Sequence, residues 1–289
     1  MAGKISFNRL TAILLSSWIG ACPSGWAAPV SHPVREKSRA LESVVALTPA
    51  LASICYDILP DGEDHRVVGV SVSTQPPPGQ KPLEVASSTA IAHEKLVALK
   101  PSLILFDPQW GKAPLVAGGV GISTARLSDI SAAYRRVGAL LLHPLRGEEL
   151  ARLFEKGLQE LRGVLSGSFF FQLDADPLVA VGGKGDFLPE LLTWLGVRNI
   201  FAQTAQAYPR VSEEAVVSKN PDFILVLGLR AERKKFEGLA LRWGRRHPGL
   251  QAVQKNQVKV VDADELTLPS AGLIRGAQAL VALVKAGSR

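Results

Sequence analysis

Residues 143–166 read HPLRGEELARLFEKGLQELRGVLS, a pattern typical of one long amphipathic helix. The leucines at positions 150, 153, 158 and 161 fall on one face of such a helix, and no strand pattern interrupts it. Apolar strand patterns alternate with helical patterns before this stretch and resume after it. We therefore predict a helix that bridges two similar halves of the chain.

The two halves show the same rhythm of short apolar runs and helical patterns. In the first half, we predict strands at 44–47, 67–70, 103–106 and 122–127 and helices at 50–59, 94–99 and 128–142. In the second half, we predict strands at 169–173, 177–181, 223–227 and 258–261 and helices at 187–195 and 270–285. Continuous apolar strands that alternate with helices are typical of parallel sheets covered on both faces.

The predicted fold class is therefore α/β, with two Rossmann-like lobes whose parallel sheets are bridged by one long α-helix. The predicted boundaries are an N-terminal lobe at 43–142, the bridging helix at 143–166 and a C-terminal lobe at 167–289. A cleft between two such lobes is a natural ligand site, because open α/β sheets expose the carboxyl ends of their strands there.

The first 27 residues have the parts of a secretory signal peptide. Lys4 and Arg9 supply its positive charge, and residues 10–19 form an apolar run that is too short to span a bilayer comfortably. Small residues follow this run. The sequence therefore predicts an exported, periplasmic protein.

Two processing sites fit this region. The first is cleavage after Ala27, which gives a signal peptide at 1–27. The second is a bacterial lipobox, Ile19-Gly-Ala-Cys22, in which Cys22 becomes the lipidated first residue. Composition does not separate the two. Residues 28–42 are polar and are interpreted as a flexible leader.

The composition is that of a folded globular protein. Hydrophobic residues make up 47% of the 289 residues and charged residues 20%, which excludes wholesale disorder. The formal net charge is +7, but the basic residues are scattered, so no nucleic-acid partner is predicted. The densest basic segment, 230–246, is interpreted as a solvated helix face, with contact to an anionic ligand or lipid head group as the alternative. Cys55 is interpreted as a small buried side chain.

Sequence patterns for catalysis and metal binding are absent. The five histidines are isolated, and neither His-x-x-x-His nor Cys-x-x-Cys occurs, so no metal site is predicted. Residues 182–186 read GGKGD, which is similar to a phosphate-binding loop, but Lys184 is followed by glycine and not by Ser or Thr. We interpret this stretch as a turn that leads into a helix opened by Phe187. The sequence predicts a protein without a cofactor and not an enzyme.

Several motifs resemble one family when they are taken in order. They are VALTPA at 45–50, RVVGV at 66–70, HEKLVALKP at 93–101, GDFLPELL at 185–192, YPRVSEEAV at 208–216 and NPD at 220–222. Together they resemble the periplasmic binding proteins for cobalamin and iron-siderophores over roughly residues 43–285. No single motif is specific, whereas their order and spacing are.

The resemblance implies a class III periplasmic binding protein, in which one helix bridges two lobes with limited hinge motion. It implies that the chain captures cobalamin or a related corrinoid and delivers it to the permease of an ABC importer. In this family one surface glutamate on each lobe pairs with arginines of the permease, and the matching positions are Glu94 and Glu214. Read without the family, each is an ordinary exposed glutamate at a helix start. A monomer is expected, which meets the membrane only through the permease or a lipid anchor at Cys22.

The resemblance also indicates which residues line the cleft. Thr48, Pro49 and Ala50 are expected at the floor of the N-terminal lobe. The opposite wall is expected to contain Lys184, Asp186 and Tyr208, the last at a position that is aromatic in cobalamin receptors.

The sequence departs from the cobalamin pattern at other aromatic positions. Val72, Ser88 and Asp107 stand where cobalamin receptors carry aromatic side chains in the N-terminal lobe. Trp110 follows the strand at 103–106 and is expected to reach the cleft, where it replaces part of the lost stacking surface. The alternative for Trp110 is that it packs on its own lobe.

Three other functions stay open at this point. A receptor for a ferric siderophore or haem fits the same fold, and the altered pocket and the positive charge favour it; in each case the ligand itself contains the cobalt or iron. An exported α/β enzyme would need a titratable pair in the cleft, for which the sequence offers only Asp186 and Asp107. A lipid-anchored sensor without an importer is the third.

Overall fold

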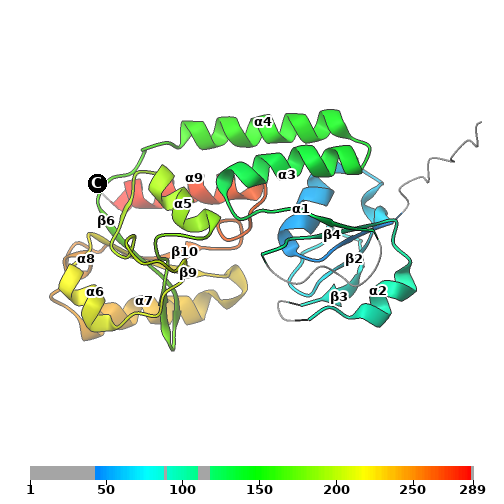
Figure 1. The fold of residues 1–289 in the computed structure, drawn as a ribbon. Coiled ribbons are helices and arrows are strands. Elements are labelled where there is room, and N and C mark those ends of the chain that lie inside the picture. Colours follow the sequence, from blue (N-terminus) through cyan, green and yellow to red (C-terminus); the bar gives the residue numbers. More distant parts are fainter. Residues whose placement is uncertain (1–42, 88–89, 110–117, 288–289) are drawn as a thin grey trace, which may run out of the picture. The chain divides into compact units, whose positions relative to one another are not determined.

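Two sheets of five strands each organise the described part of the chain (Figure 1). This computed structural model describes residues 43–87, 90–109 and 118–287, all of which belong to one compact unit. Predictions that fall outside the described residues concern the signal peptide, the leader, Cys22, Ser88 and Trp110.

The sheet of the N-terminal lobe has the strand order β3-β2-β1-β4-β5, and all of its pairs are parallel. Its strands are β1 Val44–Ala46, β2 Val67–Ser71, β3 Leu83–Ala86, β4 Leu103–Phe106 and β5 Gly119–Gly121. The chain crosses from β1 to one side of the sheet and later adds β4 on the other side. The strand order therefore reverses between β1 and β4, which is where open α/β sheets bind ligands.

The predicted strand at 122–127 is wrong. The sheet ends with β5, and helix α3 begins at Leu127. The intervening segment is fixed by Asp107, because its Oδ2 accepts hydrogen bonds from the backbone N–H and the hydroxyl of Thr124, both at 2.8 Å. The apolar residues of this segment are buried because a loop folds over the core, and not because a strand joins the sheet.

The sheet of the C-terminal lobe has the order β10-β9-β6-β7, and β8 also pairs with β6. Its strands are β6 Ser168–Ala175, β7 Leu178–Ala180, β8 Arg198–Asn199, β9 Phe223–Gly228 and β10 Val258–Asp262. The prediction of parallel strands holds here except for β7, which is antiparallel to β6. Asp176 and Pro177 alone connect these two strands, and a parallel pair needs a much longer crossover.

Three long helices lie along the two lobes: α3 (Leu127–Leu140), α4 (Pro144–Glu160) and α9 (Gly272–Gly287). Figure 1 shows α4 beside α3, running from above the N-terminal sheet toward the C-terminal one. The two helices approach so closely that a Cβ atom at Gly147 would lie 2.5 Å from the carbonyl oxygen of Tyr134. Glycine is therefore needed where α4 crosses α3. The α4 helix occupies most of the segment that we expect to bridge the lobes.

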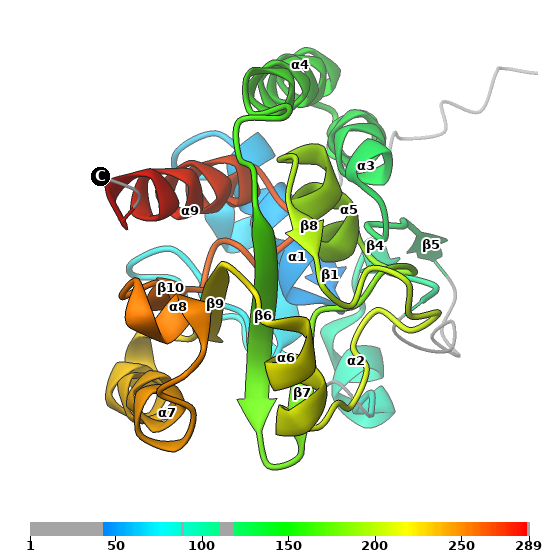
Figure 2. The ribbon, with the colours of Figure 1, turned by 90° about the vertical axis from the view of Figure 1, so that its left-hand side faces the viewer.

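The other helices cover the sheets (Figure 2). They are α1 Pro49–Ile58, α2 His93–Leu99, α5 Phe187–Trp194, α6 Glu213–Lys219, α7 Arg233–Arg246 and α8 Gln251–Gln254. The basic segment forms α7, whose Phe236 and Trp243 are buried while its arginines and lysines face solvent. The interpretation of a solvated helix face is confirmed. Among the described residues, no helix combines the length and the apolar character needed to cross a membrane.

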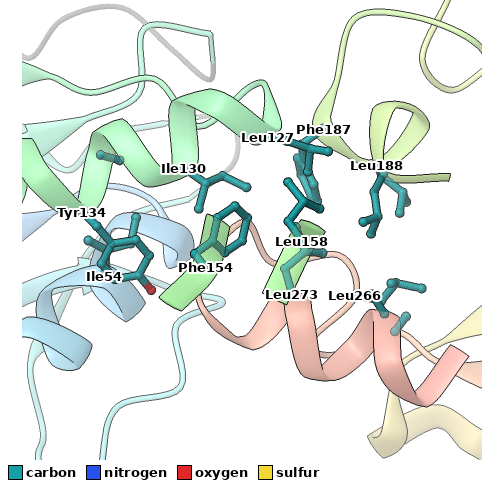
Figure 3. Close-up of a cluster of buried hydrophobic side chains, with 14 of the residues drawn as sticks. Ile54, Leu127, Ile130, Tyr134, Phe154, Leu158, Phe187, Leu188, Leu266 and Leu273 are labelled. Carbon is teal, nitrogen blue, oxygen red and sulfur yellow. The ribbon is translucent and has the colours of Figure 1, made fainter. Parts of the chain in front are cut away.

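One hydrophobic core runs from the N-terminal sheet to the C-terminal sheet. Figure 3 shows its central part, where Phe154 and Leu158 of α4 meet Ile130 of α3 and Leu273 of α9. Tyr134 is fully buried in this core, donates a hydrogen bond to Asp57 Oδ2 and accepts one from the backbone N–H of Ala271 at 2.7 Å. Helices from both halves of the chain therefore share one core.

Candidate functional site

An apolar chamber opens at the carboxyl ends of the N-terminal strands. It has a volume of about 240 Å³. Its lining residues are Leu47, Thr48, Pro49, Ala50, Ser71, Val72, Ser73, Ser87, Thr124, Phe187, Thr267, Leu268 and Pro269. None of these described residues is charged, and they come from both lobes. The chamber therefore suits an uncharged, bulky body with a few groups that can form hydrogen bonds to hydroxyls.

The floor of the apolar chamber is the start of α1. Thr48 is the N-cap of this helix and accepts a hydrogen bond from the Leu51 backbone N–H at 3.3 Å, and Pro49 occupies the first turn. Thr48, Pro49 and Ala50 thus lie together in the lining of this chamber, where the resemblance led us to expect them, and Thr48 also caps the helix; contact with a ligand stays a prediction.

A polar chamber lies beside the apolar one and has a volume of about 680 Å³. Its lining residues are Gln109, Ala125, Arg126, Arg162, Gly183, Lys184, Gly185, Asp186, Glu190, Thr193 and Trp194. Lys184 and Asp186 therefore belong to a different chamber from Thr48. One wall separates the two: Thr124 and Phe187 face the apolar side, whereas the neighbouring residues Ala125 and Asp186 face the polar side.

Asp186 and Tyr208 form a pair at this wall. Asp186 is the N-cap of α5 and accepts the Phe187 backbone N–H at 2.6 Å, while the Tyr208 phenol donates to its other oxygen at 2.5 Å. Burial raises the pKa of the Asp186 carboxyl, and these two hydrogen bonds oppose the rise. Burial and the neighbouring carboxylate also raise the pKa of Tyr208. Tyr208 is therefore held by Asp186, but it is not among the described residues that line either chamber, and its contact with a ligand stays a prediction.

The glycine turn before Asp186 has a packing role. A Cβ atom at Gly182 would collide with the carbonyl oxygen of Gln206, and one at Gly183 with that of Ala202. The Gly182 backbone N–H also donates to the Ala207 carbonyl at 2.7 Å. These contacts explain the glycines without a phosphate, because they let the segment before Tyr208 lie against the turn.

Asp107 does not present its carboxylate to the cleft. It is buried, and its second oxygen accepts the Gln109 backbone N–H at 3.0 Å, in addition to the two hydrogen bonds from Thr124. Asp107 therefore holds two loops together through these hydrogen bonds. It does not form a catalytic pair with Asp186. Val72, by contrast, is 51% exposed and lines the apolar chamber.

Some lining residues were missed by sequence reasoning. Phe187, Leu268 and Pro269 enter the apolar chamber, and Arg126 and Arg162 enter the polar one. Leu268 and Pro269 lie in the loop between β10 and α9, so the rule that ligands gather beyond strand carboxyl ends would have pointed to them. No local pattern marks the two arginines.

Glu94 and Glu214 occupy equivalent positions in the two lobes. Each is the second residue of a seven-residue helix, α2 or α6. Each helix ends in a left-handed residue, Lys100 (φ 46°) or Asn220 (φ 39°), followed by proline and then a strand, β4 or β9. Figure 1 shows both helices on the side of the molecule away from α3 and α4. The same local unit therefore presents one carboxylate from each lobe.

The two glutamates of the SEE motif have different surroundings. The Glu213 carboxylate accepts hydrogen bonds from the side chains of Arg242 at 2.9 Å, Arg246 at 2.7 Å and His247 at 2.8 Å. Partial burial acts to raise its pKa, but the hydrogen bond from His247 and the charges of Arg246 and Arg242 outweigh it and lower the pKa. Glu214 is exposed, and its own backbone N–H and the Ser212 hydroxyl lower its pKa. The charge of Glu213 is thus paired with side chains of the protein itself, whereas Glu214 faces solvent.

Within the described residues, no group of three or more His, Cys, Asp and Glu side chains is arranged to hold a metal ion. Cys55 is buried, and burial raises the pKa of its thiol to about 12.

Comparison with known proteins agrees with this geometry. The chain matches the family model described as periplasmic binding protein over residues 44–265. A vitamin B12-binding protein of Vibrio cholerae serotype O1 is 30% identical over 241 residues, which cover 79% of this chain and 84% of that protein. The crystal structure of a periplasmic vitamin B12 binding protein of Vibrio cholerae has a TM-score of 0.73 at 26% identity and covers 86% of this chain and 98% of its own.

A periplasmic haem-binding protein from Roseiflexus sp. RS-1 shares the fold, with a TM-score of 0.71 at 20% identity over 86% of this chain and 99% of that one. These matches confirm the class III fold and a binding protein in place of an enzyme. The family is exported, which confirms export, whereas processing at Ala27 or Cys22 stays a prediction. The chain belongs to the periplasmic binding protein family.

Proposed function

We propose that this protein is the substrate-binding receptor of an ABC importer and that it binds cobalamin or a related corrinoid in the interlobe cleft. The observation that carries the proposal is the apolar chamber, which both lobes line at the strand-order reversal of the N-terminal sheet. Two relatives that match across both lobes at 26–30% identity are named for vitamin B12. Members of this family deliver a small-molecule ligand to an ABC permease.

The chemistry of the lining supports a corrinoid. A corrin ring has a large apolar face and amide side chains at its rim. The chamber offers Phe187, Leu268 and Pro269 for the face, and the hydroxyls of Thr48 and Thr124 for amides. Haem and ferric siderophores are the alternatives that a binding test must compare.

A titration of the exported protein with cyanocobalamin, haemin and a ferric hydroxamate siderophore tests the ligand. We expect cyanocobalamin to bind at micromolar concentration or tighter, measured by calorimetry and by the change in corrin absorbance. Leu268→Asp places a charge in the uncharged chamber and removes about 1.5–3 kcal/mol of apolar contact, so binding should weaken by about tenfold to a hundredfold. Leu145→Asp, at a residue that is 86% exposed on α4, is the matched control. If haemin binds more tightly than cyanocobalamin, haem and not a corrinoid is the ligand.

We also propose that Glu94 and Glu214 dock the receptor on the permease. The proposal is supported by their equivalent positions in the two lobes, by their exposure, and by the neutralisation of Glu213 within the protein. Two fixed charges far apart on one rigid body set the orientation of the complex and speed the encounter.

Charge reversal tests the docking residues. We expect Glu94→Lys and Glu214→Lys to abolish receptor-stimulated ATP hydrolysis by the reconstituted cognate importer while ligand affinity is unchanged. Glu160→Lys, at an exposed position on α4, should leave both properties intact. Equal stimulation by all variants would remove these two residues from the interface.

Processing of the N-terminus belongs to the same proposal. The mass of the mature protein purified from membranes and from the periplasmic extract separates an N-terminus at Ala28 from a lipidated Cys22. A lipid-anchored mature form would identify the receptor as tethered to the membrane.

A further inference from the structure

Among the residues that the structure describes, five charged side chains line the polar chamber, and the two acidic ones already accept hydrogen bonds. Asp186 accepts hydrogen bonds from Tyr208 and from the Phe187 backbone N–H. Glu190 accepts the Leu127 backbone N–H through Oε2 at 3.0 Å. Both acidic side chains of this chamber therefore already accept hydrogen bonds from donors of the protein itself.

The positive charges of the three basic side chains are only weakly neutralised by carboxylates of the protein. Arg126 lies 3.8 Å from Glu190 Oε1, near the limit of an ion pair, and 71% of its side chain is exposed. Arg162 lies over the ring of Trp194, 5.1 Å from its centroid. Arg162 and Lys184 are exposed, and neither forms an ion pair with a carboxylate in the described part of the chain. The polar chamber is thus the electropositive side of the cleft.

The two internal segments outside the described residues, 88–89 and 110–117, contain no Asp or Glu that could balance this charge. The apolar chamber on the other side of the wall has no charged lining residue among those described. The cleft therefore divides its chemistry into an uncharged half and a half with surplus positive charge.

The position of Arg162 favours anion binding. A guanidinium held against a tryptophan face keeps its planar fork directed outward, and this fork matches the paired oxygens of a phosphate or a carboxylate. The indole also limits the side-chain motion that binding would otherwise freeze. Lys184, in the glycine turn, adds a second charge from the neighbouring segment.

We propose that the polar chamber binds an anionic group, a phosphate or a carboxylate, through Arg162, Lys184 and Arg126. The inference rests on the proposed receptor function and deepens it. It states that the ligand whose body occupies the apolar chamber carries an anionic arm, or that a free anion enters the polar chamber beside it.

Two corrinoids and one free anion test the proposal. Cobalamin carries a phosphodiester in its nucleotide arm, and cobinamide is the same macrocycle without that arm. Each is titrated into the wild-type protein, into the variant with Arg162→Gln and Lys184→Gln, and into a control with Lys234→Gln and Arg245→Gln on the exposed face of α7. Inorganic pyrophosphate is titrated into the same three proteins at constant ionic strength.

We expect the wild-type protein and the control to prefer cobalamin to cobinamide by about tenfold or more, as for one or two hydrogen bonds between charged groups. The site variant should lose this preference and bind cobinamide as well as the wild type does. Pyrophosphate should compete with cobalamin and not with cobinamide. This result assigns the anion to the arm of the ligand.

Other outcomes separate the inference from the function on which it rests. Equal binding of the two corrinoids, with pyrophosphate binding that only the site variant loses, would assign the chamber to a free anion. Equal binding without any pyrophosphate binding would overturn the inference and leave the receptor function standing. If neither corrinoid binds, the proposed function fails, and the pyrophosphate titration alone decides whether the chamber takes an anion.

Discussion

Tyr134 connects three helical segments through one phenol, and Tyr134→Phe removes only that oxygen. The phenol donates to Asp57 of α1 and accepts the Ala271 backbone N–H just before α9. Loss of a hydrogen bond to a buried carboxylate costs about 1.5–3 kcal/mol, and a buried N–H left without a partner costs about 1–3 kcal/mol. Because the two losses share one atom they do not add fully, and we expect the free energy of unfolding to fall by about 3 kcal/mol.

The effect should depend on pH, and its sign follows from Asp57. Burial raises the pKa of this carboxyl above its ordinary value, while the hydrogen bond from Tyr134 and the charges of Arg275 and Arg146 hold the rise back. A carboxyl whose pKa is higher in the folded state stabilises the fold most below its unfolded pKa, and this contribution is lost as the pH rises through the folded pKa. Without the phenol the folded pKa rises further. The destabilisation by Tyr134→Phe should therefore be larger at about pH 7 than at about pH 3, which lies below the ordinary aspartate pKa of about 3.9, so that Asp57 is mostly protonated in both states.

Urea unfolding at these two pH values, followed by circular dichroism, measures the effect. Tyr56→Phe is the matched control, because the Tyr56 hydroxyl is buried and has no hydrogen-bond partner in the described part of the chain. We expect that control to keep or raise the free energy of unfolding, by up to about 1–3 kcal/mol, equally at either pH, because it removes a buried hydroxyl that has no partner. A Tyr134→Phe variant as stable as the control, or one whose loss is the same at both pH values, would refute the reasoning about Asp57.

Three further predictions follow from packing and charge. Phe154→Ala should lower the free energy of unfolding by about 3–5 kcal/mol and keep a single calorimetric transition, because the core is shared by both lobes; two separate transitions would contradict that. Gly147→Ala should destabilise by about 1–3 kcal/mol or more through collision with Tyr134, whereas Gly238→Ala on α7, where nothing lies within 4 Å, should stabilise by about 0.5–1 kcal/mol, both measured by thermal melting. Glu213→Gln should free Arg242 and Arg246 to pair with Glu214, so stimulation of the importer should fall while ligand affinity stays constant; unchanged stimulation would show that the arginines do not reach Glu214.

The parts of the fold that could be predicted from the sequence are those where burial is continuous. Strands such as β1, β4 and β9 are buried along nearly their whole length, so they read as unbroken apolar runs. The loop after β1 could be placed at the cleft because the family resemblance indicates it, and Thr48 and Pro49 follow a recognisable strand. Once the strands and their order are known, the floor of the apolar chamber follows.

The missed elements are those whose identity depends on tertiary contacts. Strand β3 exposes Leu83 and Glu84 and buries only its last two residues, so no apolar run marks it. Segment 122–127 shows the opposite error, because its apolar residues pack on the core from a loop that Asp107 holds. Arg162 enters the polar chamber only because α4 ends beside α5, where the Trp194 indole N–H donates to the Leu158 carbonyl at 2.7 Å.

The wall between the two chambers explains how one cleft can recognise two kinds of chemistry. Asp186 and Phe187 are neighbours in sequence, yet the first faces the polar chamber and the second the apolar one. The backbone between them is fixed, because Asp186 caps α5 and the glycine turn before it packs against the segment that carries Tyr208. A substitution at Leu268 or Val72 therefore alters the apolar chamber without moving Arg162 or Lys184, and a substitution at either basic residue leaves the apolar lining intact. Affinity for the body of a ligand and selectivity for its anionic arm should consequently behave as separate, nearly additive contributions.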